Sequence, residues 1–251
     1  MHVLPPRPGG IPAPGEFDLP FLSRTEETPT ATTFRFSTQD SGFTYRSNQF
    51  VRMVLPHAND PRPWRMFSLS SSPSEPDLLA VTVKMTDSPF KRGLKALRPG
   101  DRVRVYGPFG DLLYDPARHS VFVAGGIGVT PFRGMIRFAA DTGVTKRIIL
   151  LYSARAPEEL AFREELDSIV SRHPQFEVRY TVTRPETSGR RWNGTTGRID
   201  LKALTAAVKE LDHPKVYVVG LPEMAKEVLS MLKGPLGFSE ADLEYEFFMG
   251  Y

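Results

Sequence analysis

From about residue 118 to the C-terminus, short apolar runs alternate with stretches of helical periodicity. The apolar runs cover residues 120–124, 147–152, 176–183 and 215–219, and the helical stretches cover residues 131–140, 158–170, 200–210 and 223–232. Strands that alternate with helices build a parallel sheet with helices on both faces. Residues 117–251 are therefore predicted to form a doubly wound parallel α/β domain.

Residues 17–116 have the pattern of a β domain instead. Short apolar or alternating runs at residues 32–36, 49–55, 66–69, 79–85 and 102–106 are separated by turn-forming Gly, Pro, Asn and Asp. Such spacing is typical of a small antiparallel β-barrel, and one helix over residues 90–97 is predicted to interrupt it. The boundary between the domains is expected at residues 115–119. The Pro- and Gly-rich residues 1–16 are expected to form a tail.

The composition excludes several classes of function. The 251 residues contain no cysteine, so the chain cannot hold an iron–sulfur cluster with its own thiolates. The five histidines match no metal-ligand spacing, and no metal site is expected. A net charge of +3 without any nucleic-acid motif argues against a nucleic-acid partner. No apolar run is long enough for a membrane span and no signal-peptide pattern begins the chain, so a cytoplasmic protein is expected.

The strongest local motif lies where an apolar run meets a helix, at residues 123–131 with the sequence Val-Ala-Gly-Gly-Ile-Gly-Val-Thr-Pro. Glycines allow the backbone to approach a ligand closely and to adopt positive φ. The start of the helix then offers unpaired N–H groups and a positive dipole end to a phosphate. Thr130 is predicted to cap this helix, and Pro131 to occupy its first position. The motif therefore predicts a dinucleotide-binding turn.

The turn departs from the usual dinucleotide fingerprint. Pro131 replaces its third glycine, and Ser153 and Arg155 follow the second strand where an acid would hold the ribose hydroxyl groups. A serine and an arginine there would accept the 2′-phosphate of NADPH. Thr183 and Arg184 after the third strand also favour NADPH. The alternative is that these arginines only coat the edge of the sheet, so NADPH and NADH are both candidates.

A second motif lies in the β domain, where Arg65, Phe67, Ser68 and Leu69 stand within five residues. An arginine can hold a phosphate with two parallel hydrogen bonds, and a phenyl ring can cover an apolar ring system. A basic run follows, in which Asp87 and Asp101 are the acids. Its cations are Lys84, Lys91, Arg92, Lys95, Arg98, Arg102 and Arg104. The run is either a solvated helix face or a landing site for a phosphate or an acidic protein.

In order and spacing, these motifs resemble those of the ferredoxin–NADP reductase superfamily. The resemblance covers residues 17–251. It rests on Arg65-x-Phe67-Ser68, on Gly-Pro-Phe-Gly at residues 107–110, on the glycine turn, on Gly-Leu-Pro-Glu-Met at residues 220–224 and on the aromatic C-terminus at residues 246–251. The resemblance implies a flavin-binding barrel joined to a nicotinamide nucleotide-binding domain, with FAD and NADPH or NADH as cofactors.

The resemblance also assigns roles to individual residues. In the barrel, the flavin is expected to contact Arg65 through its phosphates, Phe67 through its ring system, Ser68 and Leu69 near its hydride-accepting N5, and then Val83, Lys84, Ser88, Phe90, Lys91 and Arg92. In the α/β domain, the nucleotide is expected to contact Gly126, Gly128, Thr130 and Pro131 through its pyrophosphate and Gly220, Pro222 and Met224 near the nicotinamide. Ser68 and Glu246 are the candidate catalytic residues, and Tyr251 is the candidate ring-stacking aromatic.

Two positions depart from the pattern of the superfamily. Phe67 stands where tyrosine is more frequent, and Val219 stands where many relatives have a cysteine, which therefore cannot be required here. The implied function is transfer of hydride from NAD(P)H to FAD and then of single electrons to a separate carrier such as ferredoxin or flavodoxin. The chain could instead be the reductase component of an oxygenase or an electron-transfer subunit of a larger complex. A nucleotide-binding module without redox activity is a further alternative.

Overall fold

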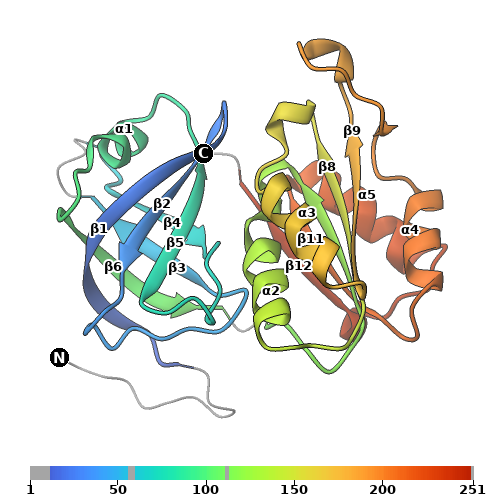
Figure 1. Cartoon of the computed structure of the whole chain (residues 1–251), viewed down its shortest axis with the longest axis horizontal. Coiled ribbons are helices and arrows are strands. Elements are labelled where there is room, and N and C mark those ends of the chain that lie inside the picture. The colour runs from blue at the N-terminus through green and yellow to red at the C-terminus, as the bar shows by residue number, and fades with distance from the viewer. Residues whose placement is uncertain (1–11, 56–59, 111–112, 250–251) are drawn as a thin grey trace. The chain divides into compact units, whose positions relative to one another are not determined.

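The computed structural model describes residues 12–55, 60–110 and 113–249. The chain divides into two compact units. Unit 1 comprises Met1–Tyr114 together with Arg133–Phe138, and unit 2 comprises Asp115–Phe132 together with Ala139–Tyr251. Figure 1 labels most of the helices and strands of both units along the chain. Tyr251, the candidate ring-stacking aromatic, lies outside the described residues.

Unit 1 is an antiparallel six-stranded barrel with one short helix. Its strands are β1 (Gly15–Thr28), β2 (Ala31–Ser37), β3 (Phe50–Val54), β4 (Trp64–Ser68), β5 (Leu78–Lys84) and β6 (Arg102–Phe109), and its helix is α1 (Pro89–Ala96). The strand order is β4-β3-β6-β1-β2-β5. Leu69, directly after β4, forms a bridge with Val81 of β5 and so joins the two ends of this order. The predicted antiparallel barrel is confirmed.

Alternate residues of the strands fill the interior of unit 1. In β6, Val103 and Val105 are buried, whereas Arg102 and Arg104 point to solvent. This period of two is what a strand with one buried face requires. The same interior receives Phe90 and Leu94 of α1, which are fully buried. Helix α1 is therefore anchored to the barrel by its apolar side, and its basic residues lie around that anchor.

Unit 2 is built on a six-stranded sheet that is parallel throughout. Its strands are β7 (Ser120–Gly125), β8 (Ile148–Ala154), β9 (Phe176–Val182), β10 (Thr195–Thr196), β11 (Lys215–Gly220) and β12 (Leu243–Phe247). Its helices are α2 (Thr130–Asp141), α3 (Arg163–Arg172), α4 (Leu201–Lys209) and α5 (Pro222–Lys233), with 3-10 helices η2 (Gly126–Val129), η3 (Pro157–Glu159), η4 (Pro185–Thr187) and η5 (Glu240–Asp242). The strand order is β10-β9-β8-β7-β11-β12.

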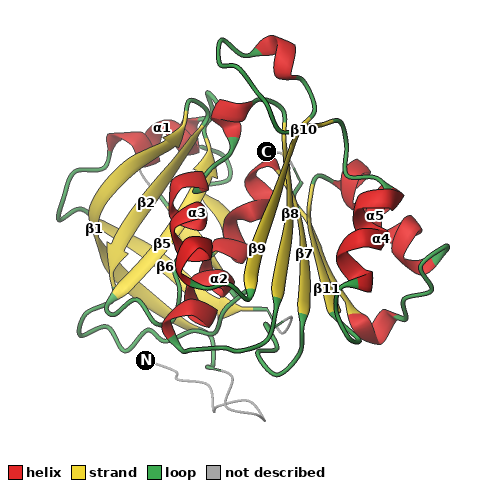
Figure 2. Ribbon diagram, turned by 45° about the vertical axis from the view of Figure 1, so that its right-hand side comes forward, coloured by secondary structure: helices red, strands yellow, loops and turns green. Residues whose placement is uncertain are grey.

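The topology of unit 2 is that of a doubly wound sheet, as predicted. From β7 the chain adds β8, β9 and β10 on one side and then returns to add β11 and β12 on the other side. Helix α3 lies on one face of the sheet and helices α4 and α5 lie on the opposite face, as Figure 2 shows. The strands β7, β8 and β11 are almost continuously buried because helices cover both of their faces. The direction in which the chain adds strands reverses between β7 and β11.

The structure corrects two features of the predicted glycine turn. Thr130 is not a helix cap, because it has helical φ and ψ and its N–H already bonds to the carbonyl oxygen of Ile127. The 3-10 helix η2 runs directly into α2, so Pro131 is the second helical residue and not the first. The hydroxyl of Thr130 donates to the same carbonyl of Ile127 at 2.6 Å. The side chain therefore bonds backward to η2.

Other element boundaries also differ from the prediction. The long strand β1 was not predicted, because Pro20 and a run of polar residues at 23–28 hide its alternation. The helix predicted over residues 158–170 begins only at Arg163, since Phe162 adopts a left-handed φ of 60° and separates it from η3. Strand β12 was not predicted either, although its residues had been singled out for other reasons.

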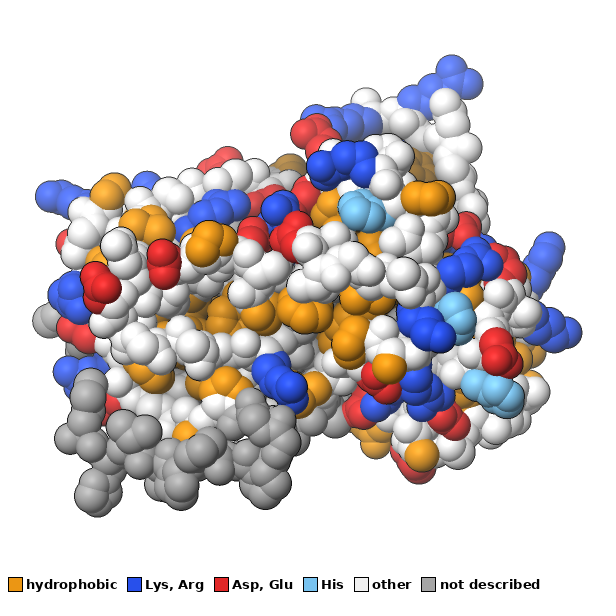
Figure 3. Space-filling view, turned by 60° about the horizontal axis from the view of Figure 1, so that its bottom comes forward, with side chains coloured by type: hydrophobic (Ala, Val, Ile, Leu, Met, Phe, Trp, Pro, Cys, Tyr) orange, Lys and Arg blue, Asp and Glu red, His pale blue; other side chains and the backbone are white. Residues whose placement is uncertain are grey.

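Among the described residues, no helix combines the length and the apolar character needed to cross a bilayer. The same residues contain no group of three His, Cys, Asp or Glu side chains placed to hold a metal ion. On the face drawn in Figure 3, basic and acidic side chains are interspersed and do not form one continuous basic area.

Candidate functional site

Arg65 of β4 is held by several hydrogen bonds in unit 1. Its Nη1 donates to the carbonyl oxygen of Arg62 and, at 2.8 Å, to that of Trp64. Its Nη2 donates to Oδ2 of Asp60 at 3.0 Å. The orientation of the guanidinium is therefore fixed by the segment that leads into β4.

Helix α1 begins beside this arginine. The ring of Phe90 lies 5.1 Å from the guanidinium carbon of Arg65, measured to the ring centroid, and 6.0 Å from the ring centroid of Phe67. Ser88 caps the helix, because its hydroxyl accepts a hydrogen bond from the N–H of Lys91 at 3.3 Å. The structure thus brings together the predicted phosphate ligand Arg65, the predicted ring contact Phe67 and the predicted helix start.

Lys91 is a cation in a mostly buried position. Its side chain is on a residue only 6% exposed, and Nζ donates to Oγ1 of Thr86 at 3.1 Å. Burial lowers the pKa of Lys91 below its ordinary value, and the nearby charges of Arg65 and Lys84 lower that pKa further. An anion placed beside the ammonium group would favour its charged form. The site therefore has the electrostatic character of a phosphate site.

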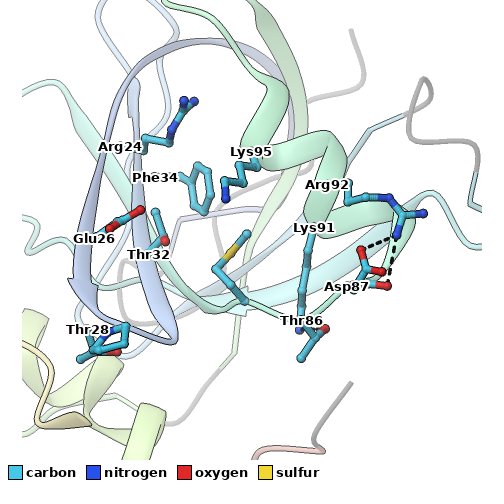
Figure 4. Close-up of a pocket in the computed structure, with 12 residues that line it drawn as sticks. Arg24, Glu26, Thr28, Thr32, Phe34, Thr86, Asp87, Lys91, Arg92 and Lys95 are labelled. Atoms are coloured by element: carbon cyan, nitrogen blue, oxygen red, sulfur yellow. Dashed lines mark hydrogen bonds and ion pairs between the residues drawn. The ribbon is translucent and has the colours of Figure 1, made fainter. Parts of the chain in front are cut away.

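A cavity of about 510 Å³ opens on the side of α1 that faces the β1–β2 hairpin. Four cations line it, Arg24, Lys91, Arg92 and Lys95, together with Glu26, Thr28, Pro29, Thr32, Phe34, Met85, Thr86 and Asp87. Figure 4 shows Lys91 pointing toward Thr86, whereas Arg92 turns to Asp87, to which its Nη1 donates at 2.6 Å. The excess of positive charge over the two acids suits a polyanionic ligand.

The remaining candidates of unit 1 lie at different depths. Ser68 ends β4 in a buried position with 7% exposure. Leu69 and Val83 are members of the barrel core, so a ligand would reach them through their backbone atoms. Lys84, the last residue of β5, is exposed.

The predicted dinucleotide turn lies at the carboxyl end of β7 in unit 2. Gly126 has a φ of +54°, a conformation that residues with a Cβ rarely adopt. A Cβ on Gly128 would lie only 2.3 Å from the carbonyl oxygen of Val219. The turn therefore packs directly on the end of β11, with no space for a side chain.

The second predicted glycine segment meets the first one. Gly220 ends β11, and a Cβ there would lie 3.0 Å from Sδ of Met224. The same sulfur would lie 3.2 Å from a Cβ on Gly125, the last residue of β7. Pro222 is the first residue of α5, next to this contact. Gly220, Pro222 and Met224 thus adjoin the turn at Gly126 and Gly128, at the point where the winding of the sheet reverses.

The arginines predicted to select the nucleotide lie at the same edge of the sheet. The N–H of Arg184 donates to the carbonyl oxygen of Arg155 at 2.8 Å, and the N–H of Thr183 donates to that of Ala154 at 2.9 Å. Ser153 pairs in register with Gly125 and is half-buried. Both arginines are exposed, and no ion pair joins either one to an acid among the described residues.

Glu246 lies on the edge strand β12. It pairs in register with Val219, and the N–H of Phe248 donates to the carbonyl oxygen of Gly220 at 2.8 Å. The candidate acid is therefore beside the glycine segment that ends β11. The described residues of unit 2 thus bring all of its candidates to the carboxyl ends of five neighbouring strands, β9, β8, β7, β11 and β12, where doubly wound folds bind their ligands.

Asp60 was missed by the sequence reasoning. Its Oδ2 accepts from Arg65 and, at 3.3 Å, from the N–H of Phe90. The N–H of Arg62 and the charge of Arg65 keep the pKa of this carboxyl below its ordinary value. In the sequence it appears only as part of an Asn-Asp-Pro turn signal, so nothing there connected it with Arg65.

Comparisons with known proteins agree with this arrangement. Residues 122–229 match the family model of the oxidoreductase NAD-binding domain. The chain is 28% identical to the reductase subunit of stachydrine N-demethylase from Rhizobium meliloti, over 92% of this chain and 66% of that protein. It is 28% identical to ferredoxin–NADP reductase B from Sorangium cellulosum, over 81% of this chain and 85% of that protein.

Solved structures show the same fold. The cytochrome P450 reductase of Amycolatopsis superposes with a TM-score of 0.80 at 19% identity, over 94% of this chain and 70% of that one. The chain spans less than two thirds of the length of the first curated relatives that it matches, 66% and 61%. These matches confirm the resemblance drawn from the motifs: residues 122–229 match the oxidoreductase NAD-binding domain, an antiparallel barrel precedes them in the sequence, and the chain has the fold of the solved reductase.

Proposed function

We propose that this protein is an NADPH-dependent flavin oxidoreductase that transfers hydride to FAD and then releases single electrons to a separate carrier protein. The observation that carries the proposal is the convergence of the unit 2 candidates on one edge of the sheet. Two glycine segments lie there, one with Gly128 packed against the backbone of β11 and one ending at Gly220, and two exposed arginines lie at the same ends of the strands. An edge of this kind accommodates a pyrophosphate close to the backbone and a further phosphate at the arginines.

The flavin site of the proposal lies in unit 1. Arg65, Lys91 and the start of α1 supply cationic and N–H groups for phosphates, and the cavity beside α1 has room for a further part of the cofactor. Phe67 offers a ring face, and Ser68 a hydroxyl, at positions that match the superfamily motif. Bound FAD would supply a hydride acceptor that can release its electrons one at a time.

The residues of the chain would bind and orient the flavin and the nucleotide, and they would carry out little acid–base chemistry. Alignment of the hydride donor with the flavin N5 is the main contribution that a protein makes to such a transfer. We assign Ser68 to a hydrogen bond near N5, and Glu246 and Tyr251 to the surroundings of the nicotinamide. The domain limits, a barrel over 17–116 and a nucleotide domain over 117–251, belong to the same proposal.

The proposed electron acceptor is a ferredoxin-like or flavodoxin-like carrier. The name of the Sorangium relative, of which this chain covers 85%, supports a ferredoxin. The name of the Rhizobium relative, a reductase subunit of a demethylase, supports the alternative of an oxygenase component. A cytoplasmic location is part of the proposal.

The experiment that tests the proposal is an anaerobic titration of the purified protein. Any bound flavin is first identified by mass, and NADPH and NADH are then added in parallel while the flavin absorbance is followed. We expect bleaching of FAD by NADPH at low concentration, and turnover with a one-electron dye. A protein that binds neither flavin nor nucleotide would refute the proposal. Bleaching without transfer to any one-electron acceptor would refute its second half.

Nucleotide selection gives a separate prediction. Replacing both Arg155 and Arg184 with alanine is expected to raise the KM for NADPH by about 100-fold, because each charge-assisted hydrogen bond to a 2′-phosphate is worth about 1.5–3 kcal/mol. The KM for NADH, which lacks that phosphate, should change less than twofold. Steady-state reduction of a dye measures both constants.

The matched control for this variant is Arg172→Ala. Arg172 is exposed at the end of α3, just before β9 begins. It therefore lies near the amino ends of the strands, whereas Arg155 and Arg184 lie at their carboxyl ends. This substitution removes one positive charge from the same unit and should leave both KM values unchanged. Equal losses for NADPH and NADH in the double variant would show that the two arginines do not read the 2′-phosphate.

A further inference from the structure

The guanidinium of Arg65 has five N–H groups, and three of them are engaged. Both N–H groups of Nη1 are directed to backbone carbonyls, those of Arg62 and Trp64. One N–H group of Nη2 is directed to Asp60. The groups without a partner among the described residues are therefore the Nε–H and the second N–H of Nη2.

The two remaining N–H groups belong to the nitrogens that form one edge of the guanidinium. A phosphate or carboxylate accepts two parallel hydrogen bonds from such an edge. A flexible arginine would have to give up the freedom of its side chain to present that edge. Here the engaged groups already fix the guanidinium, whose side chain is only 16% exposed.

Asp60 also bonds to the start of helix α1, beside Arg65. The oxygen that accepts from Arg65 also accepts from the N–H of Phe90, in the first turn of α1. Its other oxygen accepts from the N–H of Arg62 at 2.9 Å. One carboxylate, with a side chain only 7% exposed, thus ties together the segment before β4, the guanidinium of Arg65 and the start of α1.

We propose that Asp60 is a positioning residue for flavin binding, which holds Arg65 so that its Nε–Nη2 edge is free for a phosphate of the cofactor. The inference rests on the proposed function, because it assumes that Arg65 meets a flavin phosphate. Asp60 itself makes no contact with the flavin in this arrangement. Its effect on binding acts only through the orientation of Arg65.

The alternative arrangement has the opposite consequence. If Asp60 occupied the phosphate position itself, the flavin would have to displace it, and its removal would strengthen binding. The geometry favours positioning, because Arg65 keeps two donors for a phosphate while it is bonded to Asp60. The sign of the change in flavin affinity therefore decides between the two arrangements.

The test compares Asp60→Asn with the wild-type protein in the binding of FAD and riboflavin. Asparagine keeps the size of the side chain. Its NH2 group, however, replaces one of the two carboxylate oxygens that accept hydrogen bonds. We expect the Kd of FAD to rise about tenfold, the loss of roughly one charge-assisted hydrogen bond. The Kd of riboflavin, which has no phosphate, should change less than twofold. In the Arg65→Ala background, the same substitution should leave the Kd of FAD unchanged.

The control variant is Asp18→Asn. Asp18 pairs with Arg102 on the same barrel at 3.0 Å, and both of these side chains are more than half exposed. Asp18→Asn removes one carboxylate charge, as Asp60→Asn does, and the Kd of FAD should stay at the wild-type value. An unchanged or lowered Kd of FAD in Asp60→Asn would overturn the inference, as would an equal loss of riboflavin, which would show a structural role only. A wild-type protein that binds no flavin would refute the proposed function instead.

Discussion

Replacing Gly128 with alanine is expected to destabilise the protein by about 3 kcal/mol or more, and to abolish measurable reduction of the flavin by NADPH. The added Cβ would lie 2.3 Å from the carbonyl oxygen of Val219, a backbone atom at the end of a central strand. Either β11 or the turn must move, and the turn is the proposed pyrophosphate site. Chemical denaturation measures the loss of stability, and stopped-flow absorbance measures the reduction.

The control for this substitution is Gly189→Ala. A Cβ on Gly189 would meet no atom within 4 Å, and the glycine has no positive φ that would strain an alanine. Its free energy of unfolding should stay within about 0.5 kcal/mol of the wild-type value. A Gly128→Ala protein with wild-type stability would mean that β11 and η2 are not packed as the structure describes. Wild-type stability with slow reduction would place the effect in nucleotide binding alone.

Replacing Arg65 with alanine is expected to yield a protein that purifies without flavin. Two parallel charge-assisted hydrogen bonds to a phosphate are worth together about 3 kcal/mol, which corresponds to a rise of about 100-fold in the Kd of FAD. The substitution also leaves Asp60 without its cation. Flavin absorbance per protein after gel filtration, followed by titration with FAD, measures the effect.

Arg104→Ala serves as the control for the loss of an arginine from the barrel. Arg104 pairs with Glu16 at 3.1 Å on the outer surface, and both side chains are more than half exposed. Surface pairs of this kind contribute about 1 kcal/mol or less to stability, so flavin content should not change. Full retention of flavin by Arg65→Ala, with an unaltered circular dichroism spectrum, would exclude Arg65 as a phosphate ligand.

The alternation of elements in unit 2 could be predicted because local sequence determines it. Buried parallel strands are continuous apolar runs, and the glycines of the first turn are required by φ and by close approach. The same reasoning failed for Thr130, since a 3-10 helix runs directly into α2 and gives this residue helical φ and ψ, which an N-cap residue does not have. It also failed for β1, whose inward residues are separated by Pro20 and by exposed polar residues.

Only those residues of the candidate site that lie within a recognisable sequence motif could be predicted. Arg65 belongs to such a motif, and the structure places its guanidinium beside Phe90 at the start of α1. Asp60 belongs to no motif, and one of its contacts, with Phe90, joins residues that are 30 positions apart in the chain. A contact of that range follows from the folding of the barrel and has no periodicity or turn signal in the sequence.

If FAD binds as proposed, the buried position of Lys91 would link the amount of folded protein to the supply of that cofactor. Burial lowers the pKa of Lys91, and a phosphate beside the ammonium group would favour its charged form. Any ligand that binds only the folded chain stabilises it by mass action. In a cell short of flavin, the unloaded polypeptide would therefore unfold more often and be exposed to proteases for longer. Riboflavin metabolism would then set the lifetime of this protein as well as its activity.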